Sequence, residues 1–392
     1  MRLLVTGVSG LIGSNVAAAA AQQSWSVLGT WRETPVSLPG ARTMQLDVAD
    51  RHDCVALAEE LEPDVIVHAG AESGLGRVQR EPQLAELDVL GAENTLAAAR
   101  AVRARYALVS CDLLFSGARP PGECWDEGDP AEPATALGRS LLAREQLVQR
   151  SSGSWLITRP ADVYGVNLAI PVAAGVRYLP THPPPADAAE AHARHVWERS
   201  GPPLRWVASL RAGRILVAPA GVRRSPTYAW DYAQRLCELI AQECEGVFNT
   251  AGPTSLARLS QMRLLARAFG CELELVREGP PAASLRAREG GAPSTPPATL
   301  RAGASGEGPP PTPLRAGESG PQGATASSPP LPANTALCDH KANFVLGHPA
   351  VDPFSGHRLM RRQLERLLGD VEPPAAPRSP AAAPPIALEV LG

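Results

Sequence analysis

The sequence predicts a doubly wound α/β fold, a parallel sheet with helices on both faces, joined to a smaller lobe. Short apolar runs alternate with helical patterns along the first half of the chain. A glycine-rich turn follows the first of these runs, and the run at 63–68 is apolar without alternation. Continuous apolar strands between helices are typical of a parallel sheet that is buried on both faces.

The chain opens on a strand pattern at 1–6, a turn with Gly7, Gly10 and Gly13, and an alanine-rich helix. In a dinucleotide site the first glycine permits the tight turn, and the second lets the backbone approach the pyrophosphate. The third lets helix and strand pack closely. The helix N-terminus then offers free N–H groups to phosphate. This order predicts a nicotinamide dinucleotide site. The alternative is a glycine-rich turn in another α/β protein.

The remaining elements of the sheet follow in alternation. Strands are expected at 25–31, 43–46, 63–68, 106–110 and 155–159, and helices at 52–61, 84–104 and 135–150. The end of the second strand is where a dinucleotide fold meets the adenosine ribose. Arg32 at that point favours NADP(H), because arginine accommodates a 2′-phosphate, whereas Glu33 would suit NAD(H). Both residues can also be ordinary solvated charges.

Composition narrows the class of protein. The net charge is −3, which gives no indication of a nucleic-acid partner. No apolar run reaches the roughly 18–20 residues of a membrane span. The seven cysteines are scattered and none forms CxxC, which predicts reduced thiols, a cytoplasmic location and no metal site. Because the N-terminus starts directly with a strand pattern, we expect no secretion signal.

Beyond the sheet, the composition changes twice. A segment dense in Pro, Gly, Ala, Ser and Thr cannot bury enough apolar surface to fold, and we expect it to be a disordered insertion. The expected organisation is a dinucleotide domain at 1–165 completed by 226–252, a lobe from 166–225, 253–278 and 331–368, an insertion at 279–330 and a flexible tail at 369–392.

Two features of the lobe bear on ligands. Arg223 and Arg224 precede an expected helix start, which Ser225 or Thr227 would cap, and a diphosphate would suit them; solvated surface arginines are the alternative. A helix at 186–197 carries two histidines three residues apart without a partner carboxylate motif. We expect them on its surface.

Several stretches in order resemble the extended short-chain dehydrogenase/reductases, and most closely the dTDP-4-dehydrorhamnose reductase family. The stretches are RLLVTGVSGLIGSNV, LDVAD, PDVIVHAGA, DVLGAENTLAAA, SCDLLFSG, RPADVYGVN, RRSPTYAWDYAQRL, GVFNTAGPTSLARLSQMRLLARAFG and PANTALCDHKA. Carried over residue by residue, the resemblance implies a cofactor site in which Ser9, Leu11 and Ile12 supply backbone contacts. It also implies that adenine contacts Asp47 and Val48, and that the nicotinamide half lies beside Ala69, Gly70 and Ala71.

The same resemblance implies a catalytic Thr, Tyr and Lys, and this sequence departs at all three positions. They hold Cys111, Leu137 and Leu141, the last two within the family's YGxxK pattern. The tyrosine normally donates the proton, and the lysine four residues on lowers its pKa from the same helix face. Tyr164, after the sixth strand, is a candidate substitute without a cation at helical spacing.

Two functional classes therefore stay open. One is a dinucleotide-binding protein with impaired catalysis that binds a sugar nucleotide or a regulatory protein partner. A regulatory subunit of another enzyme, which resembles the same family, is a precedent. The other is an NADPH-dependent reductase of a dTDP-4-keto-6-deoxy sugar that uses a non-standard acid. A homodimer is a further open alternative.

Overall fold

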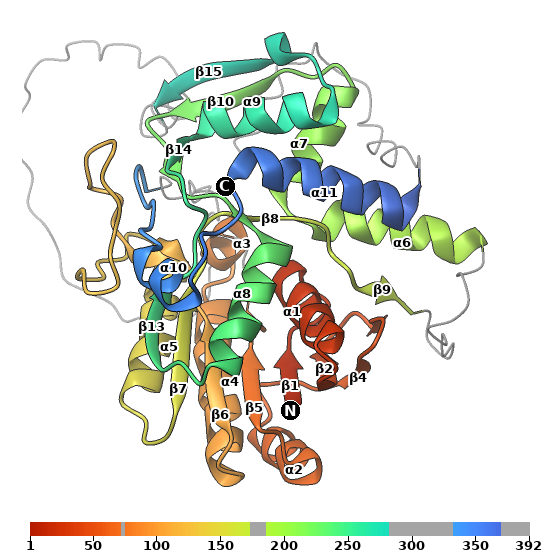
Figure 1. Cartoon of the computed structure of the whole chain (residues 1–392), viewed down its shortest axis with the longest axis vertical. Coiled ribbons are helices and arrows are strands. Elements are labelled where there is room, and N and C mark those ends of the chain that lie inside the picture. The colour runs from red at the N-terminus through yellow and green to blue at the C-terminus, as the bar shows by residue number, and fades with distance from the viewer. Residues whose placement is uncertain (72–74, 173–185, 282–331, 370–392) are drawn as a thin grey trace, which may run out of the picture.

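A computed structural model describes residues 1–71, 75–172, 186–281 and 332–369. Its centre is a seven-stranded sheet in which every pair of neighbouring strands is parallel (Figure 1). From one edge to the other the strands are β13 (Gly246–Asn249), β7 (Trp155–Arg159), β6 (Arg105–Val109), β5 (Val65–His68), β1 (Arg2–Thr6), β2 (Ser26–Trp31) and β4 (Arg42–Gln45). The order reverses at β1, which is where a doubly wound sheet opens a crevice at its carboxyl edge.

Helices cover both faces of this sheet, which confirms the doubly wound class. One face carries α1 (Leu11–Gln22), α8 (Ala229–Ala241) and α10 (His340–Leu346). The other carries α2 (Arg51–Leu61), α4 (Gln83–Ala101) and α5 (Ala136–Gln149), with α3 (Leu75–Arg80) beside α5. Strand residues such as Leu3 and Ile66 are fully buried between the layers, as their apolar runs require.

A smaller lobe lies above the carboxyl edge of the sheet (Figure 1). It has its own apolar core and consists of α6 (Ala186–Arg199), α7 (Pro202–Arg211), α9 (Arg258–Phe269), α11 (Pro353–Leu368) and the parallel pair β10 (Leu216–Ala220) and β15 (Val276–Pro281). The remaining described elements are short: β3 (Val36–Ser37), β8 (Val163–Tyr164), β9 (Ile170–Pro171), β11 (Arg223–Arg224), β12 (Thr227–Tyr228), β14 (Leu256–Ala257) and the 3₁₀ turns η1 (Asp112–Leu114) and η2 (Leu273–Leu275).

Some expectations differ from the structure. After α9 the chain forms the turn η2 and then β15, which extends to Pro281. Neither Ser225 nor Thr227 caps α8. That helix begins at Ala229, and the Thr227 hydroxyl instead donates to the Ala161 carbonyl. The expected insertion at 279–330 lies outside the described residues except for 279–281. The expected tail at 369–392 lies outside them except for Gly369.

The expectation of reduced thiols is wrong for two of the seven cysteines. Cys124 and Cys338 form a disulfide across a sequence separation of 214 residues. Spacing rules search for cysteines close in sequence, and this pair is brought together only by the fold. In the described part of the chain, no helix is long and apolar enough to cross a bilayer.

Candidate functional site

A cleft of about 540 Å³ opens at the carboxyl edge of the sheet, beneath the smaller lobe. All twelve residues expected to contact a cofactor line it: Gly7, Ser9, Gly10, Leu11, Ile12, Gly13, Arg32, Asp47, Val48, Ala69, Gly70 and Ala71. They come from the ends of the four neighbouring strands β5, β1, β2 and β4 and from the start of α1. The cleft therefore lies at the point where the strand order reverses, although the role of each residue stays a prediction.

The glycine turn is shaped by backbone contacts that no larger side chain would allow. Gly7 has φ +75°, and a Cβ there would lie 2.6 Å from the Gly70 Cα. A Cβ on Gly13 would collide with the backbone carbonyl of Gly7. Gly10 is the N-cap of α1 and has no side chain that could accept a hydrogen bond. The first backbone N–H groups of the helix therefore remain available as donors to a ligand. This cradle fits a phosphate group.

The side-chain amide of Asn94 fixes the cleft wall at the ends of β2 and β4. The Asn94 side chain donates to the Val48 carbonyl at 3.0 Å and to the Ala49 carbonyl at 2.9 Å, which holds the 47–49 turn against α4. Arg32 lines the same end, and its guanidinium contacts the Glu33 carboxylate at 2.6 Å. The two charges weighed as alternatives in the sequence are thus paired with each other at this rim.

The opposite wall, Ala69–Gly70–Ala71, is held by a buried polar chain. The Gly70 N–H donates to the Thr6 hydroxyl at 3.2 Å, and that hydroxyl lies 2.9 Å from His68 Nδ1. Burial, helped by the positive charge of Arg144, lowers the pKa of His68 to about 3. The imidazole is therefore neutral at physiological pH and acts here as a positioning group.

The three positions that correspond to the family's catalytic residues lie together, but only one of them reaches the cleft. Cys111 lines the cleft, and burial followed by the Asp112 charge raises the pKa of its thiol to about 12. Leu137 and Leu141 are 3% and 4% exposed and pack in an apolar cluster with Phe115. Neither leucine is among the residues that line the cleft. A thiol with this pKa stays protonated, and the leucines offer no proton.

Tyr164, the candidate substitute acid, does not line the cleft. Its side chain is fully buried in the core of the smaller lobe, 4.3 Å from the His357 ring, and its hydroxyl donates to the Pro353 carbonyl at 3.4 Å. Burial, reinforced by the neighbouring Tyr228, raises the pKa of Tyr164 well above its ordinary value. Its neighbour Val163 reaches the cleft instead, because adjacent strand residues point to opposite sides.

The cleft also holds two ion pairs, one buried and one half-buried. The Arg224 Nε lies 3.4 Å from the Asp112 carboxylate, which also accepts from the Thr335 hydroxyl. Burial raises the pKa of Asp112, although Arg224 and Thr335 favour its charged form. The Nη2 of Arg224 is buried without a hydrogen-bond partner among the described residues. A buried guanidinium with a free donor at a cleft wall can bind an anionic or hydroxyl-rich ligand.

The second pair joins Arg258 to Asp162, at 2.8 Å, with Gln261 completing the contacts of the carboxylate. Burial alone would raise the pKa of Asp162, but Arg258 and these hydrogen bonds lower it overall. Sequence reasoning missed Asp112 and Asp162 as parts of the site. Each follows a sheet strand within a few residues, and that position is the signal that could have found them.

Two further expectations from the lobe are corrected. Only Arg224 of the arginine pair reaches the cleft; Arg223 donates to the Ser255 carbonyl and hydroxyl instead. His192 and His195 are buried, not on the surface, because the face of α6 that carries them packs onto the lobe. Burial lowers the pKa of both histidines.

Residues 1–170 match the family model described as the RmlD substrate binding domain. This part of the chain is therefore similar to the RmlD family. The match confirms the resemblance seen in the sequence, and the matched region contains the glycine turn, the carboxyl ends of six sheet strands and Cys111, Leu137 and Leu141.

Relatives of known description fall into two groups. Methionine adenosyltransferase 2 subunit beta of Xenopus laevis is 32% identical over 165 residues, which is 42% of this chain and 47% of that protein. A probable low-salt glycan biosynthesis reductase, Agl14 of Haloferax volcanii, is 28% identical over 168 residues, 43% of this chain and 55% of that protein. The matches thus span about half the length of the curated relatives.

Solved structures share the fold over nearly the whole chain. A dTDP-4-dehydrorhamnose reductase from Clostridium acetobutylicum aligns with a TM-score of 0.64 at 14% identity, covering 93% of this chain and 100% of that one. The enzyme from Bacillus anthracis, in complex with NADP, gives 0.64 at 15% identity, covering 92% and 99%. A Thermus thermophilus UDP-glucose 4-epimerase with NAD gives 0.65 at 19% identity, covering 95% and 100%.

Proposed function

We propose that the chain binds a nicotinamide dinucleotide in the cleft. The support is the cradle around Gly7 and Gly13, where backbone fills the space a Cβ would need and the start of α1 faces the opening. Relatives of this fold have been solved with NADP or NAD. We favour NADP(H), because Arg32 lies at the rim where a 2′-phosphate would compete with Glu33 for its guanidinium.

We further propose that the chain is impaired in the sugar reduction of its family. One observation carries this proposal: the side chains at the expected Tyr and Lys positions, Leu137 and Leu141, are buried in an apolar cluster and do not line the cleft. A bound nicotinamide supplies a hydride, but reduction of a ketone also needs a proton. Loss of general acid catalysis alone removes about 10²–10⁴ in rate.

A protein partner is the function that we favour for such a chain. Its relatives include methionine adenosyltransferase 2 subunit beta, which by its name is one subunit of a larger enzyme. A second candidate is binding of a sugar nucleotide, either as ligand or as substrate of a reductase with a non-standard acid. It is favoured by the Asp112–Arg224 pair and the free Nη2 of Arg224 at the far end of the cleft.

Calorimetry with NADPH and NADH tests the first proposal. We expect binding of both, tighter for NADPH, with the preference reduced in Arg32→Ala and retained in Arg100→Ala, an exposed arginine at the end of α4. Absence of binding of either dinucleotide would contradict the proposed site. Equal affinities in the wild-type chain would contradict the NADP(H) preference alone.

Turnover is tested separately, with NADPH and dTDP-4-dehydrorhamnose. We expect no appreciable oxidation by the wild-type chain. The triple variant Cys111→Thr, Leu137→Tyr and Leu141→Lys should gain activity if only the acid is missing. Fast oxidation of NADPH by the wild-type chain would refute the proposed loss of catalysis and support the reductase alternative.

A further inference from the structure

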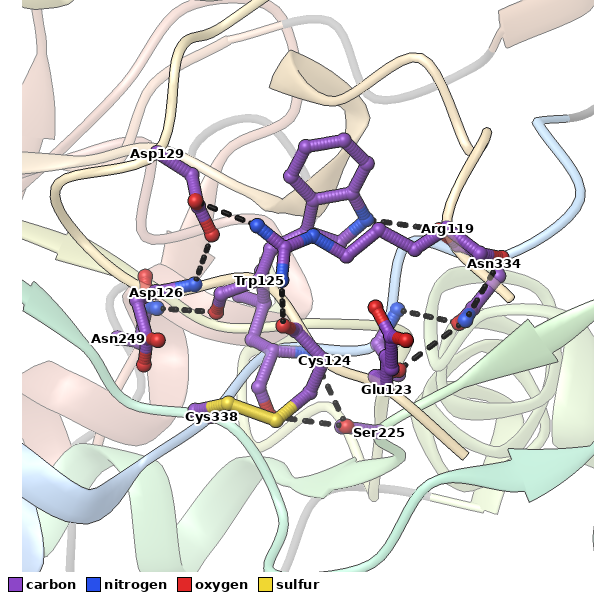
Figure 2. Close-up of a disulfide and its surroundings, with 12 residues drawn as sticks. Arg119, Glu123, Cys124, Trp125, Asp126, Asp129, Ser225, Asn249, Asn334 and Cys338 are labelled. Carbon is purple, nitrogen blue, oxygen red and sulfur yellow. Dashed lines mark hydrogen bonds and ion pairs between the residues drawn. A yellow bond between two sulfur atoms is a disulfide. The ribbon is translucent and has the colours of Figure 1, made fainter. Parts of the chain in front are cut away.

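Two segments far apart in the sequence run side by side around the disulfide (Figure 2). Trp125 and Leu337 form a parallel bridge, the Trp125 N–H donates to the Ala336 carbonyl at 2.8 Å, and the Cys338 N–H donates to the Trp125 carbonyl at 2.9 Å. We call 124–126 the first arm and 338–340 the second arm. The first reads Cys-x-Asp and the second Cys-x-His.

The ends of these arms gather metal-ligand atoms. One carboxylate oxygen of Asp126, the Cys338 sulfur and one ring nitrogen of His340 all lie within 4.8 Å of one another, and Cys124 joins them through the disulfide. Among the described residues, the side chains of Asp126 and His340 have no hydrogen-bond or ion-pair partner. The neighbouring Asp129, in contrast, is engaged by Arg119 at 2.5 Å and by the Asp126 N–H at 2.7 Å.

We propose that Cys124, Cys338, His340 and Asp126 bind one Zn²⁺ ion when the disulfide is reduced. Reduction by two equivalents of a small-molecule thiol breaks the S–S bond, gives two cysteine thiols and leaves the oxidised thiol as its disulfide. Binding of Zn²⁺ then displaces both thiol protons to solvent and forms two Zn–S bonds. The disulfide and the metal are thus alternative links between the same two arms.

The donor set fits zinc. Zn²⁺ prefers four tetrahedral ligands from thiolate, imidazole and carboxylate, with Zn–S about 2.3 Å and Zn–N about 2.0–2.1 Å. Thiolates favour zinc over magnesium or calcium, which take oxygen ligands. Sulfurs at that distance from a common metal are about 3.8 Å apart in a tetrahedron, so reduction must separate them by a side-chain rotation. The other two ligands are exposed and unpaired, and can turn toward the metal with little cost.

Residue spacing alone does not reveal this site, because the two cysteines are separated by 214 residues and neither belongs to a CxxC motif. The fold supplies the missing proximity. The arms also have a structural connection to the cleft, since Thr335, three residues before Cys338, binds Asp112 at the cleft wall. A metal at the arms would keep this segment in place when the disulfide is absent.

Cobalt titration of the full chain tests the proposal. The protein is treated with a chelator and a phosphine reductant, desalted without oxygen, and titrated with Co²⁺ and then Zn²⁺. We expect one Co²⁺ per chain, with thiolate-to-cobalt charge-transfer absorption and the intense visible bands of tetrahedral cobalt, both removed by Zn²⁺. The air-oxidised protein should show neither.

Variants assign the ligands. His340→Ala and Asp126→Asn should weaken metal affinity at least about tenfold, since loss of mere supporting contacts costs about 10–100-fold. Cys124→Ser should lower the charge-transfer absorption, because only the Cys338 thiolate remains, whereas the control Cys244→Ser, at a free and partly exposed cysteine, should not change it. Circular dichroism checks folding. Absence of tetrahedral bands in the folded, reduced wild-type chain, or bands unchanged by all three ligand variants, would overturn the proposal.

Discussion

Loss of the Cys124–Cys338 disulfide should lower the free energy of unfolding substantially. A cross-link over a separation of 214 residues removes about 18 cal/mol/K of entropy from the unfolded chain, or about 5 kcal/mol at 25 °C, in the chain-entropy description. Unfolding entropy is about 2.1 cal/mol/K per residue, hence about 0.6 kcal/mol/K for the roughly 300 described residues. The double variant Cys124→Ala, Cys338→Ala should therefore melt about 8 °C lower.

The assay is thermal denaturation followed by circular dichroism, in oxidising buffer that contains a chelator. The chelator removes any metal that would link the arms. Cys244→Ser is the matched control, and its effect should stay within about 0.5 kcal/mol, because this cysteine is unbridged and partly exposed. A melting temperature of the double variant within about 2 °C of the wild type would refute the reasoning, because the long loop would then contribute no stability.

Three further outcomes follow from contacts in the sheet, the cleft and α8. Glu145→Gln should destabilise the fold by about 3–5 kcal/mol, measured by urea denaturation, because it leaves the buried Arg159 guanidinium without its anion at 2.6 Å. Gly13→Val should abolish dinucleotide binding in calorimetry, since its side chain collides with the preceding turn. The hydrogen bond from Glu238 raises the pKa of His348, and NMR titration should place it above 6.5 in the wild type and near 6.5 in Glu238→Gln. Stability from this pair is fully present below the unfolded pKa and is lost as the pH rises through the folded one; its exposure keeps the contribution below about 1 kcal/mol.

Each of these outcomes has a comparison that can contradict it. Glu190→Gln breaks an exposed ion pair on α6 and should lower the free energy of unfolding by less than about 0.5 kcal/mol. If Glu145→Gln lowered it by no more than this, the buried Glu145–Arg159 pair would not have the importance that we assign to it. Gly128→Ala, with open space around its Cβ position, should bind dinucleotide normally. An unchanged titration of His348 in Glu238→Gln would show that the carboxylate does not set its pKa.

The sequence by itself determined the class of fold and the place of the cleft. Apolar runs that alternate with helical patterns predict a parallel sheet, because strands buried on both faces carry apolar side chains on both sides. The spacing of Gly7, Gly10 and Gly13 located the turn, since its geometry excludes a Cβ. Leu137 and Leu141 were recognisable as losses because neighbours in the sequence fix their register. Such features depend on contacts between residues that lie close along the chain.

Only the tertiary structure decided which distant residues meet. It buried Tyr164 in the lobe core and brought Asp112, Arg224 and Thr335 to one wall of the cleft. It also joined Cys124 to Cys338. Pairings of this kind depend on how the smaller lobe packs over the carboxyl edge of the sheet. Residue spacing carries no record of that packing, because the meeting segments are separated by whole elements whose lengths do not constrain their contacts.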